Sequence, residues 1–132
     1  MKEKQVTEKQ EFVVDEHRYP IYSYHGHFTR EVETKRLTMS MTLSIPTENI
    51  APISPWIMQQ SEKKDVTIVR HLSKNGIPLK TVFLDFMGAQ CTKYVEEYDA
   101  VRKEVVLHLT ATFENRVTTD DEQRNKISDL LS

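Results

Sequence analysis

The sequence predicts a mainly β fold, a β-sandwich or partial barrel of antiparallel or mixed strands with one short helix packed alongside. Apolar and hydroxyl side chains alternate over Leu37–Ile45, as they do in a strand with one dry face and one wet face. The Asn75-Gly76 pair separates two runs rich in β-branched and aromatic residues, which is typical of a tight hairpin turn. Before the C-terminal region, strong helical spacing occurs only within residues 47–60. We therefore expect strands throughout and a single helix inside the domain.

One domain is expected, because 132 residues lie within the usual size of a single domain and can bury one core. Residues 1–10 are polar apart from Val6, so they are predicted to form a mobile N-terminal tail. The β domain is expected over residues 11–117. Residues 118–132 are predicted to form a polar C-terminal tail with a frayed helix, because only a few apolar residues recur in it.

The first half of the domain should open with a hairpin. Glu11–Val14 and Tyr19–Thr29 are rich in β-branched and aromatic residues on either side of a polar turn over residues 15–18. The alternating strand Leu37–Ile45 follows. Thr47 is then a candidate cap of the single helix, and Ser54-Pro55 offers a second helix start with proline at the first helical position. The helical spacing is carried by Ile50, Ile53, Trp56 and Ile57.

The second half of the domain should contain two further hairpins. Strands are predicted over Val66–Leu72 and Pro78–Phe86, joined by the turn at Asn75-Gly76. Beyond Met87-Gly88 we expect a separate pair, Gln90–Tyr98 and Glu104–Glu114, around a turn over residues 99–103. The apolar side chains that share one face of the last strand are Val105, Leu107, Leu109, Ala111 and Phe113.

Composition excludes several partner classes. The formal net charge of -2 provides no broad positive field, so nucleic acid and membrane insertion are not expected. The N-terminal residues do not resemble a secretion signal, and the one cysteine, Cys91, fits a reducing cytoplasm. The sequence therefore predicts a cytoplasmic protein, whose export would need a route without a cleaved signal peptide.

Histidine and cysteine provide the first candidates for chemistry. His25 and His27 are predicted to point to one face of a strand, as two metal ligands would, but no matching third and fourth ligands follow. Cys91 and His108 are a possible nucleophile and base, yet Cys91 lies in a β pattern that is typical of a buried inert thiol. His71 and His108 are each isolated within a strand pattern, so each is expected to be a half-buried or interface side chain. We predict no metal site, no cofactor site and no catalytic residue, and hence a protein that is not an enzyme.

Three other motifs have plainer interpretations. Glu96 and Glu97 should face opposite sides of their strand, so with Asp99 they do not form a shared carboxylate site. Lys74–Gly76 joins two strands, whereas phosphate-binding loops precede a helix. Trp56 is expected to pack on the sheet instead of docking a partner. Hydroxyl-rich strand faces remain over residues 23–29, 38–44 and 110–112, and in a ring they could line a wet channel.

Three stretches of the chain resemble the haemolysin-coregulated tube proteins of type VI secretion systems, and in particular the short variants from Bacteroidetes that are related to phage tail tube proteins. The first is Thr29–Glu33, which follows the second strand. The second is the Ile50–Met58 helix with its Trp-Ile-Met sequence. The third is Leu79–Phe113, whose segments look like the paired closing strands of that family. The likeness covers roughly residues 12–114.

The resemblance implies a structural protein that assembles with copies of itself into a closed ring, a hexamer in the family, and whose rings stack into an expelled tube. Sheath, tip or effector proteins of a secretion apparatus would then be its partners. One departure is that Thr34–Leu37 stands where family members carry a Gly-Arg-Pro turn and a glycine, in the loop through which rings contact one another. The alternative function is a small β-barrel ligand-binding or carrier module, which needs an apolar cavity. A hydrolase using Cys91 or a carboxylate is a third class.

Overall fold

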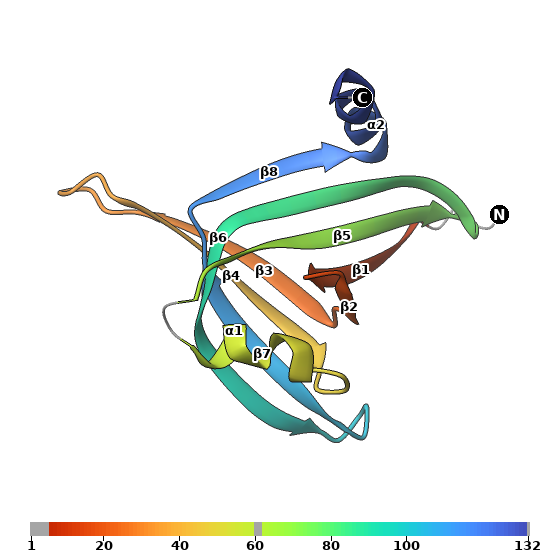
Figure 1. Cartoon of the computed structure of the whole chain (residues 1–132). Coiled ribbons are helices and arrows are strands. Elements are labelled where there is room, and N and C mark those ends of the chain that lie inside the picture. Colours follow the sequence, from red (N-terminus) through yellow and green to blue (C-terminus); the bar gives the residue numbers. More distant parts are fainter. Residues whose placement is uncertain (1–5, 60–61, 132) are drawn as a thin grey trace.

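The computed structural model describes residues 6–59 and 62–131, and its strands form two joined antiparallel layers (Figure 1). Sheet A contains, in spatial order, β2 (His17–Pro20), β1 (Val6–Val14), β5 (Lys64–Lys74), the first half of β6 (Ile77–Asp99) and β8 (Asn115–Asp120). Sheet B contains the second half of β6, then β7 (Glu104–Thr112), β4 (Leu37–Pro46) and β3 (Ser23–Arg30). The layers do not close into a barrel, because β2 and β3 stand at the two ends of the strand order. The predicted mainly β fold is confirmed.

Strand β6 belongs to both layers. Its first half pairs with β5 on one side and β8 on the other, and its second half pairs with β7. It bends at Gly88, whose φ of 62° lies in the left-handed region and whose N–H donates a 2.9 Å hydrogen bond to Asp65 Oδ1. The predicted break into Pro78–Phe86 and Gln90–Tyr98 is therefore wrong, because the glycine redirects the strand without ending it.

The N-terminal strand begins earlier than the sequence predicted. Residues 6–10 pair with residues 70–74 of β5, so the prediction of a mobile tail up to residue 10 is wrong for this part, while residues 1–5 lie outside the described range. Polar side chains do not prevent this pairing, since the backbone hydrogen bonds stabilise it and Glu8 forms an ion pair with Arg70. The hydrogen bond from Arg70 is the main cause that lowers the pKa of the Glu8 carboxyl below its ordinary value.

The predicted first hairpin is only half correct. β2 pairs with β1 around a turn at Asp15 and Glu16, as expected, but β3 pairs with β4 in the other layer. The chain passes from sheet A to sheet B at Ile21 and Tyr22. The Ile21 N–H donates to the Gln10 carbonyl at 3.0 Å, and the Tyr22 N–H donates to the Ser44 carbonyl at 2.8 Å. A single strand over Tyr19–Thr29 is therefore wrong, because the crossing interrupts it.

Residues 118–131 form regular secondary structure that continues from sheet A. Residues 118–120 extend β8, and a helix, α2 (Asp121–Leu131), follows it. The helix is attached through Arg124, whose guanidinium lies 4.0 Å from the centre of the Phe83 ring and donates to Asp85 Oδ2. The predicted C-terminal helix is present, and its contact with β6 explains why it is not an isolated element.

The core lies between the layers and includes one helical segment. The segment consists of a 3₁₀ turn, η1 (Ala51–Ile53), and α1 (Ser54–Met58), which contributes buried Trp56 and Ile57. Among the described residues it is the one helical segment inside the predicted domain; Gln60 lies outside them. Thr47 is not its cap, because the Thr47 hydroxyl donates to the Val105 carbonyl at 3.1 Å. The largest fully buried side chains are Trp56, Phe12, Phe86, Met41, Leu43, Ile45, Ile53, Ile68 and Leu109.

The remaining hairpins agree with the sequence. Asn75 and Gly76 both have positive φ, 52° and 76°, as the turn between β5 and β6 requires. β6 and β7 pair around the predicted turn after Asp99. The hairpin of β3 and β4 projects well beyond the body of the molecule, so Leu37 at its far end is exposed although it belongs to the predicted dry face (Figure 1).

Candidate assembly face and edges

All four strands of sheet B contribute to one hydroxyl- and imidazole-rich face, here called the polar face. The strand register aligns its residues in rows: Thr42, for example, lies between His25 of β3 and Thr110 of β7. The opposite face of the sheet is the core side, which bears buried Met41 and Leu43. The polar face comprises Ser23, His25, His27 and Thr29 of β3, Thr38, Ser40, Thr42 and Ser44 of β4, His108, Thr110 and Thr112 of β7, and Gln90, Lys93, Val95 and Glu97 of β6. The hydroxyl-rich segments predicted separately from the sequence therefore form one surface.

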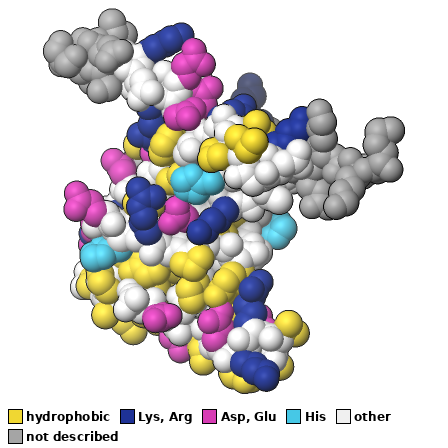
Figure 2. Space-filling model, turned by 90° about the vertical axis from the view of Figure 1, so that its right-hand side faces the viewer, with side chains coloured by type: hydrophobic (Ala, Val, Ile, Leu, Met, Phe, Trp, Pro, Cys, Tyr) yellow, Lys and Arg dark blue, Asp and Glu magenta, His cyan; other side chains and the backbone are white. Residues whose placement is uncertain are grey.

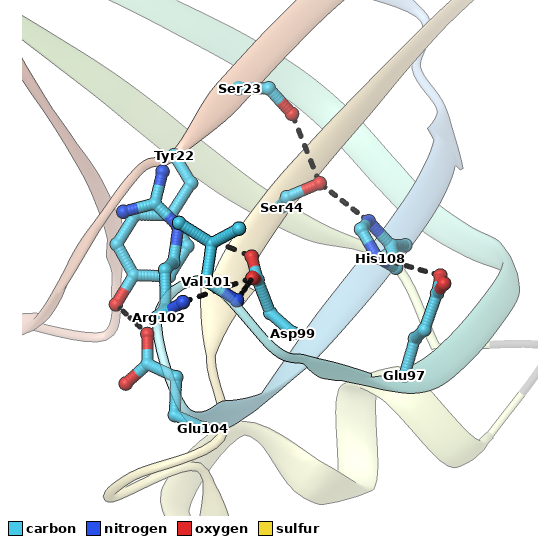
Figure 3. Close-up of polar contacts among 9 residues, drawn as sticks. All are labelled: Tyr22, Ser23, Ser44, Glu97, Asp99, Val101, Arg102, Glu104 and His108. Atoms are coloured by element: carbon cyan, nitrogen blue, oxygen red, sulfur yellow. Dashed lines mark hydrogen bonds and ion pairs between the residues drawn. The ribbon is translucent and has the colours of Figure 1, made fainter.

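A chain of polar contacts crosses this face from one edge of the sheet to the other (Figure 3). The Ser23 hydroxyl donates to Ser44 Oγ at 3.0 Å, and Ser44 Oγ lies 2.6 Å from His108 Nδ1. On the other side of the imidazole, His108 Nε2 lies 3.4 Å from Glu97 Oε2. One residue from each strand of sheet B takes part, and we call the four residues the cross-sheet chain.

The cross-sheet chain contains serine, histidine and glutamate, but its setting suits a structural role. Ser44 is only 6% exposed and lies near the end of β4, at a position paired on both sides by β3 and β7. The backbone N–H groups of a central strand bind its neighbours, so they do not converge on a reacting carbonyl as oxyanion-hole donors do. The arrangement instead satisfies a buried hydroxyl. Ser44 departs from the prediction of a solvent-facing hydroxyl, because Ser23 and His108 cover it.

A second polar cluster fixes the turn between β6 and β7 (Figure 3). Asp99 Oδ1 accepts hydrogen bonds from the backbone N–H groups of Val101 at 2.9 Å and Arg102 at 3.0 Å. The Arg102 guanidinium lies 3.8 Å from the centre of the Tyr22 ring, and the Tyr22 hydroxyl donates to Glu104. The hydrogen bond to Glu104 is the main cause that raises the pKa of Tyr22. The cluster ties this turn to the start of β3.

Sheet B has two free edges among the described residues. β3 pairs with β4 alone, and the second half of β6 pairs with β7 alone. Both edges carry exposed apolar side chains on the core side. At the β6 edge, Tyr94 lies opposite buried Leu109 in the register, and Tyr98, which is 63% exposed, lies opposite Val105. At the β3 edge, Phe28 is 50% exposed. We call Tyr94, Tyr98 and Val105 the apolar rim.

The structure separates Cys91 from its proposed base. Cys91 is buried on the core side, where its Sγ lies 3.5 Å from the Lys93 carbonyl oxygen. Burial raises the pKa of this thiol, which disfavours the reactive thiolate. His108 projects onto the polar face, so the register places the two side chains on opposite sides of sheet B. A Cys-His pair is thus not assembled.

The remaining sequence candidates are placed individually. His25 and His27 share the polar face as predicted, but no group of three or more His, Cys, Asp or Glu residues in the described part of the chain is arranged to hold a metal ion. Glu96 and Glu97 alternate across β6 as predicted, and only Glu97 contacts His108. His71 Nε2 lies 2.8 Å from Glu11 Oε1 on sheet A. Trp56 packs in the core, as predicted.

The surface has charges of both signs. Figure 2 shows Lys and Arg side chains interspersed with Asp and Glu over one side of the molecule, together with exposed apolar groups. Such a surface does not concentrate one sign of potential as a nucleic-acid-binding face does. Within the described residues, neither helix has the length and apolar content needed to cross a membrane.

Comparison with solved structures shows that Hcp1 proteins share this fold. The chain superposes on Hcp1 from Flavobacterium johnsoniae with a TM-score of 0.66 and 14% identity, over 85% of this chain and 97% of that one. Hcp1 from Salmonella typhimurium gives a TM-score of 0.60 at 9% identity, over 86% and 92% of the two chains. A structure of the sheath/tube terminator of an extracellular contractile injection system gives 0.50 at 18% identity, over 83% and 92%. The chain therefore has an Hcp-type fold, as the sequence resemblance predicted.

Comparison by sequence adds no closer assignment. No family model matches the chain, and no curated protein matches it. The identities to the solved structures are low enough that the likeness is carried by strand order and layer geometry. Sequence reasoning missed Ser44 as the partner of His108, because their contact depends on the pairing of β4 with β7, which are not consecutive in the chain.

Proposed function

We propose that this protein is a structural subunit that assembles with copies of itself, six in number as in the family it resembles, into a closed ring, and that such rings stack into the tube of a secretion or injection apparatus. The single observation that carries the proposal is the pair of free edges on sheet B. An unpaired strand edge is a template for joining another chain, and a closed ring removes every such edge.

Strand direction makes the two free edges complementary. The pairings from β3 to β4, from β4 to β7 and from β7 to β6 are all antiparallel, so β3 and the second half of β6 run in opposite directions. A neighbouring copy related by simple rotation therefore presents β3 to β6 in the antiparallel sense. The contact is head-to-tail, and repeated rotation closes it into one continuous inner sheet.

Side chains at the edges provide apolar area for the same contact. Tyr94 and Tyr98 stand on the core side of one edge and Phe28 on the core side of the other, so head-to-tail pairing brings the two sets toward each other. Burying apolar surface contributes about 25 cal/mol per Å², and interfaces concentrate tyrosine and phenylalanine for this reason. The polar face then lines the channel, where neutral hydroxyls bind water without retaining a passing polypeptide by charge.

The geometry favours this function over the carrier alternative. A carrier barrel closes its sheet around an apolar cavity, whereas here the strand order is open and the space between the layers holds Trp56, Phe12 and Phe86, each fully buried. Catalysis is likewise not supported by the cross-sheet chain. We therefore propose a mechanical role, with sheath, tip or effector proteins as partners and export from the cytoplasm without a cleaved signal peptide.

Native mass spectrometry of the purified full-length chain tests the proposal, with analytical ultracentrifugation at tens of micromolar as the second measurement. A closed hexamer is expected, and electron microscopy should show rings with a central channel. A strictly monomeric protein at these concentrations would refute the ring. A ring with a different copy number would correct the stoichiometry and leave the edge-to-edge contact in place.

A further inference from the structure

An open cleft of about 320 Å³ lies where the chain crosses from sheet A to sheet B. It is lined by residues 8–10 of β1 and by residues 20–24, which run from the end of β2 through the crossing into β3, and we call it the crossing cleft. β2 ends opposite Glu11, so it does not cover the part of β1 that lines the cleft. The cleft therefore opens beside the start of β3, at a free edge of sheet B.

Contacts within the subunit hold the walls of the crossing cleft in place. The Tyr22 hydroxyl donates to Glu104, and the Arg102 guanidinium lies 3.8 Å from the centre of the Tyr22 ring. The Tyr24 ring packs edge-on against Phe86, with the ring centres 6.2 Å apart. The cleft is therefore formed before anything enters it, and a pre-formed site loses less free energy to ordering when it binds.

Two polar groups of the crossing cleft have no hydrogen-bond partner in the described part of the chain, although both are shielded from solvent. They are Gln10 Oε1 and the Tyr24 hydroxyl. The Gln10 amide nitrogen donates to Glu8 Oε1 at 3.2 Å, and this contact fixes the orientation of the amide because a carboxylate only accepts. The oxygen of Gln10 is then left as an acceptor without a donor. Buried polar groups are normally paired, so the cleft favours an occupant that carries a hydrogen-bond donor.

Tyr98 has the properties of such an occupant. It is 63% exposed at the free edge of β6, and it lies on the core side of sheet B, the side to which Tyr24 also points. Its ring supplies apolar contact area and its hydroxyl can donate. Within one subunit Tyr98 and the crossing cleft stand at opposite edges of sheet B, so a second copy is needed to bring them together.

Strand direction brings Tyr98 of a neighbouring copy to the crossing cleft. In the head-to-tail contact β3 runs antiparallel to β6 of the neighbour, so the start of β3 lies beside the C-terminal end of that β6. Within the subunit, the row of paired residues that begins at Ser23 on β3 ends at Val95 on β6. Continued in step across the contact, this row places Tyr98 past the start of β3, beside Pro20 at the cleft.

We infer that Tyr98 of each subunit occupies the crossing cleft of the next subunit and donates from its hydroxyl to Gln10 Oε1, so that it anchors the head-to-tail contact. The Gln10 side chain is only partly buried, so its amide can turn toward the entering hydroxyl. Tyr94 does not compete for this place, because the same row sets it beside Tyr24, whose ring packs there against Phe86. The inference rests on the proposed function, since it names the anchor of the ring contact.

Photo-crosslinking in the assembled full-length protein tests where Tyr98 lies. A photoreactive phenylalanine is placed at residue 98, and subunits of normal and heavy isotope content are mixed so that mass distinguishes crosslinks between copies. Such crosslinks are expected from residue 98 to residues 8–10 or 20–24. The same probe at Val101, which is 92% exposed in the adjacent turn, is the matched control and should not reach the cleft. Crosslinks between copies that map elsewhere, or none in assembled rings, would overturn the inference and leave the ring in place.

A second measurement tests the hydrogen bond, with the dissociation of rings on dilution as the readout. Tyr98→Phe removes one hydroxyl from each contact and should raise the dissociation constant per contact by about 2- to 12-fold. Gln10→Met removes the acceptor, and in that background Tyr98→Phe should have no further effect. Tyr94→Phe is the matched control, whose effect Gln10→Met should leave unchanged. Coupling of Gln10 to Tyr94 instead of Tyr98, or to neither, would overturn the inference, whereas an unmodified chain that remains monomeric would refute the proposed function as well.

Discussion

The indole Nε1 of Trp56 donates a hydrogen bond of 2.9 Å to the carbonyl oxygen of Ala89, one residue beyond the bend at Gly88. The ring of Trp56 is fully buried and lies 6.0 Å from that of Phe12, which belongs to sheet A. One side chain of the single internal helix therefore contacts both the bend of β6 and the opposite layer. This contact explains why a very short helix is held firmly in place.

Trp56→Ala should lower the free energy of unfolding by about 3–5 kcal/mol, because it leaves a large cavity between the layers. Trp56→Phe retains much of the apolar volume but leaves the Ala89 carbonyl without its donor, so a loss of about 1–3 kcal/mol is expected. Urea denaturation measures both. Met58→Ala, at an exposed position of the same helix, is the control and should change stability by less than about 0.5 kcal/mol. Equal effects of Trp56→Ala and Met58→Ala would contradict the described core.

Gly88→Ala should destabilise the protein more than Gly76→Ala. Both glycines have positive φ, so each alanine incurs backbone strain of about 1 kcal/mol. A Cβ at residue 76 meets nothing within 4 Å, whereas at residue 88 it would lie 2.7 Å from Glu114 Cδ. Thermal denaturation of the two variants compares them, and adding Glu114→Ala to Gly88→Ala should recover the excess loss. An unchanged loss in the double variant would show that the Glu114 clash is not its source.

Stability should decline in alkali partly because of Cys91. Burial raises the pKa of this thiol in the folded protein above its ordinary value of 9.0. The folded state therefore binds the thiol proton more tightly than the unfolded state does. The stability that this difference adds to the folded state is fully present below the ordinary pKa, and it is lost as pH rises from that value through the folded-state pKa. Cys91→Ala should flatten the decline in a series of urea denaturations across this range. A decline of the same slope in Cys91→Ala would assign the effect to other groups, such as Tyr19, whose pKa burial also raises.

Tyr94→Lys should prevent ring closure and leave the subunit folded. Tyr94 lies on the apolar rim at the free edge of β6, and a lysine there would place a charge in the proposed head-to-tail contact. Size-exclusion chromatography and native mass spectrometry report the assembly state, and circular dichroism reports the fold. Val101→Lys, at a 92% exposed position in the neighbouring turn, is the matched control and should form rings. Intact rings of Tyr94→Lys would place the contact elsewhere.

Raising the salt concentration should separate stacked rings before it dissociates single rings. The projecting tip between β3 and β4 carries exposed residues of both signs, including Glu33, Lys35 and Arg36, and attraction between exposed charges is screened within about 8 to 10 Å at physiological ionic strength. Contacts between strand edges are hydrogen-bonded and apolar, so they depend less on salt. Electron microscopy across a salt series would show the order of dissociation. If single rings dissociated at lower salt than the stacks did, the contact between strand edges would be the more electrostatic of the two.

Local sequence patterns predicted the elements whose structure is decided by near neighbours. The alternation over Leu37–Ile45 corresponds to β4, and the backbone conformation required at Asn75-Gly76 corresponds to the turn that is observed. The helical spacing within residues 47–60 predicted the segment that contains η1 and α1. In each case the residues that determine the structure lie within one element or one turn, so no knowledge of the topology is needed.

The misplaced elements depend on partners that are distant in sequence. Residues 6–10 look like a tail because Val6 is their one apolar side chain, yet β5 offers them a backbone edge. In the sequence Gly88 suggests the end of a strand. In the structure the strand continues through a bend at Gly88, where the Gly88 N–H donates to Asp65. His108 was predicted to be isolated, because Ser44 becomes its neighbour only when β4 pairs with β7. These relationships follow from the order of strands in the sheets, which residue patterns alone do not specify.

The continuity of β6 through both layers has a consequence for folding. Two sheets that share one strand cannot open independently, because loss of β6 from either removes the partner of β5 and β8 or of β7. We therefore expect hydrogen exchange of the buried amides in both layers to report one cooperative opening reaction instead of two. The same connection delays folding, since β4 and β7 pair across a long stretch of chain and contacts of large sequence separation slow the search for the native state.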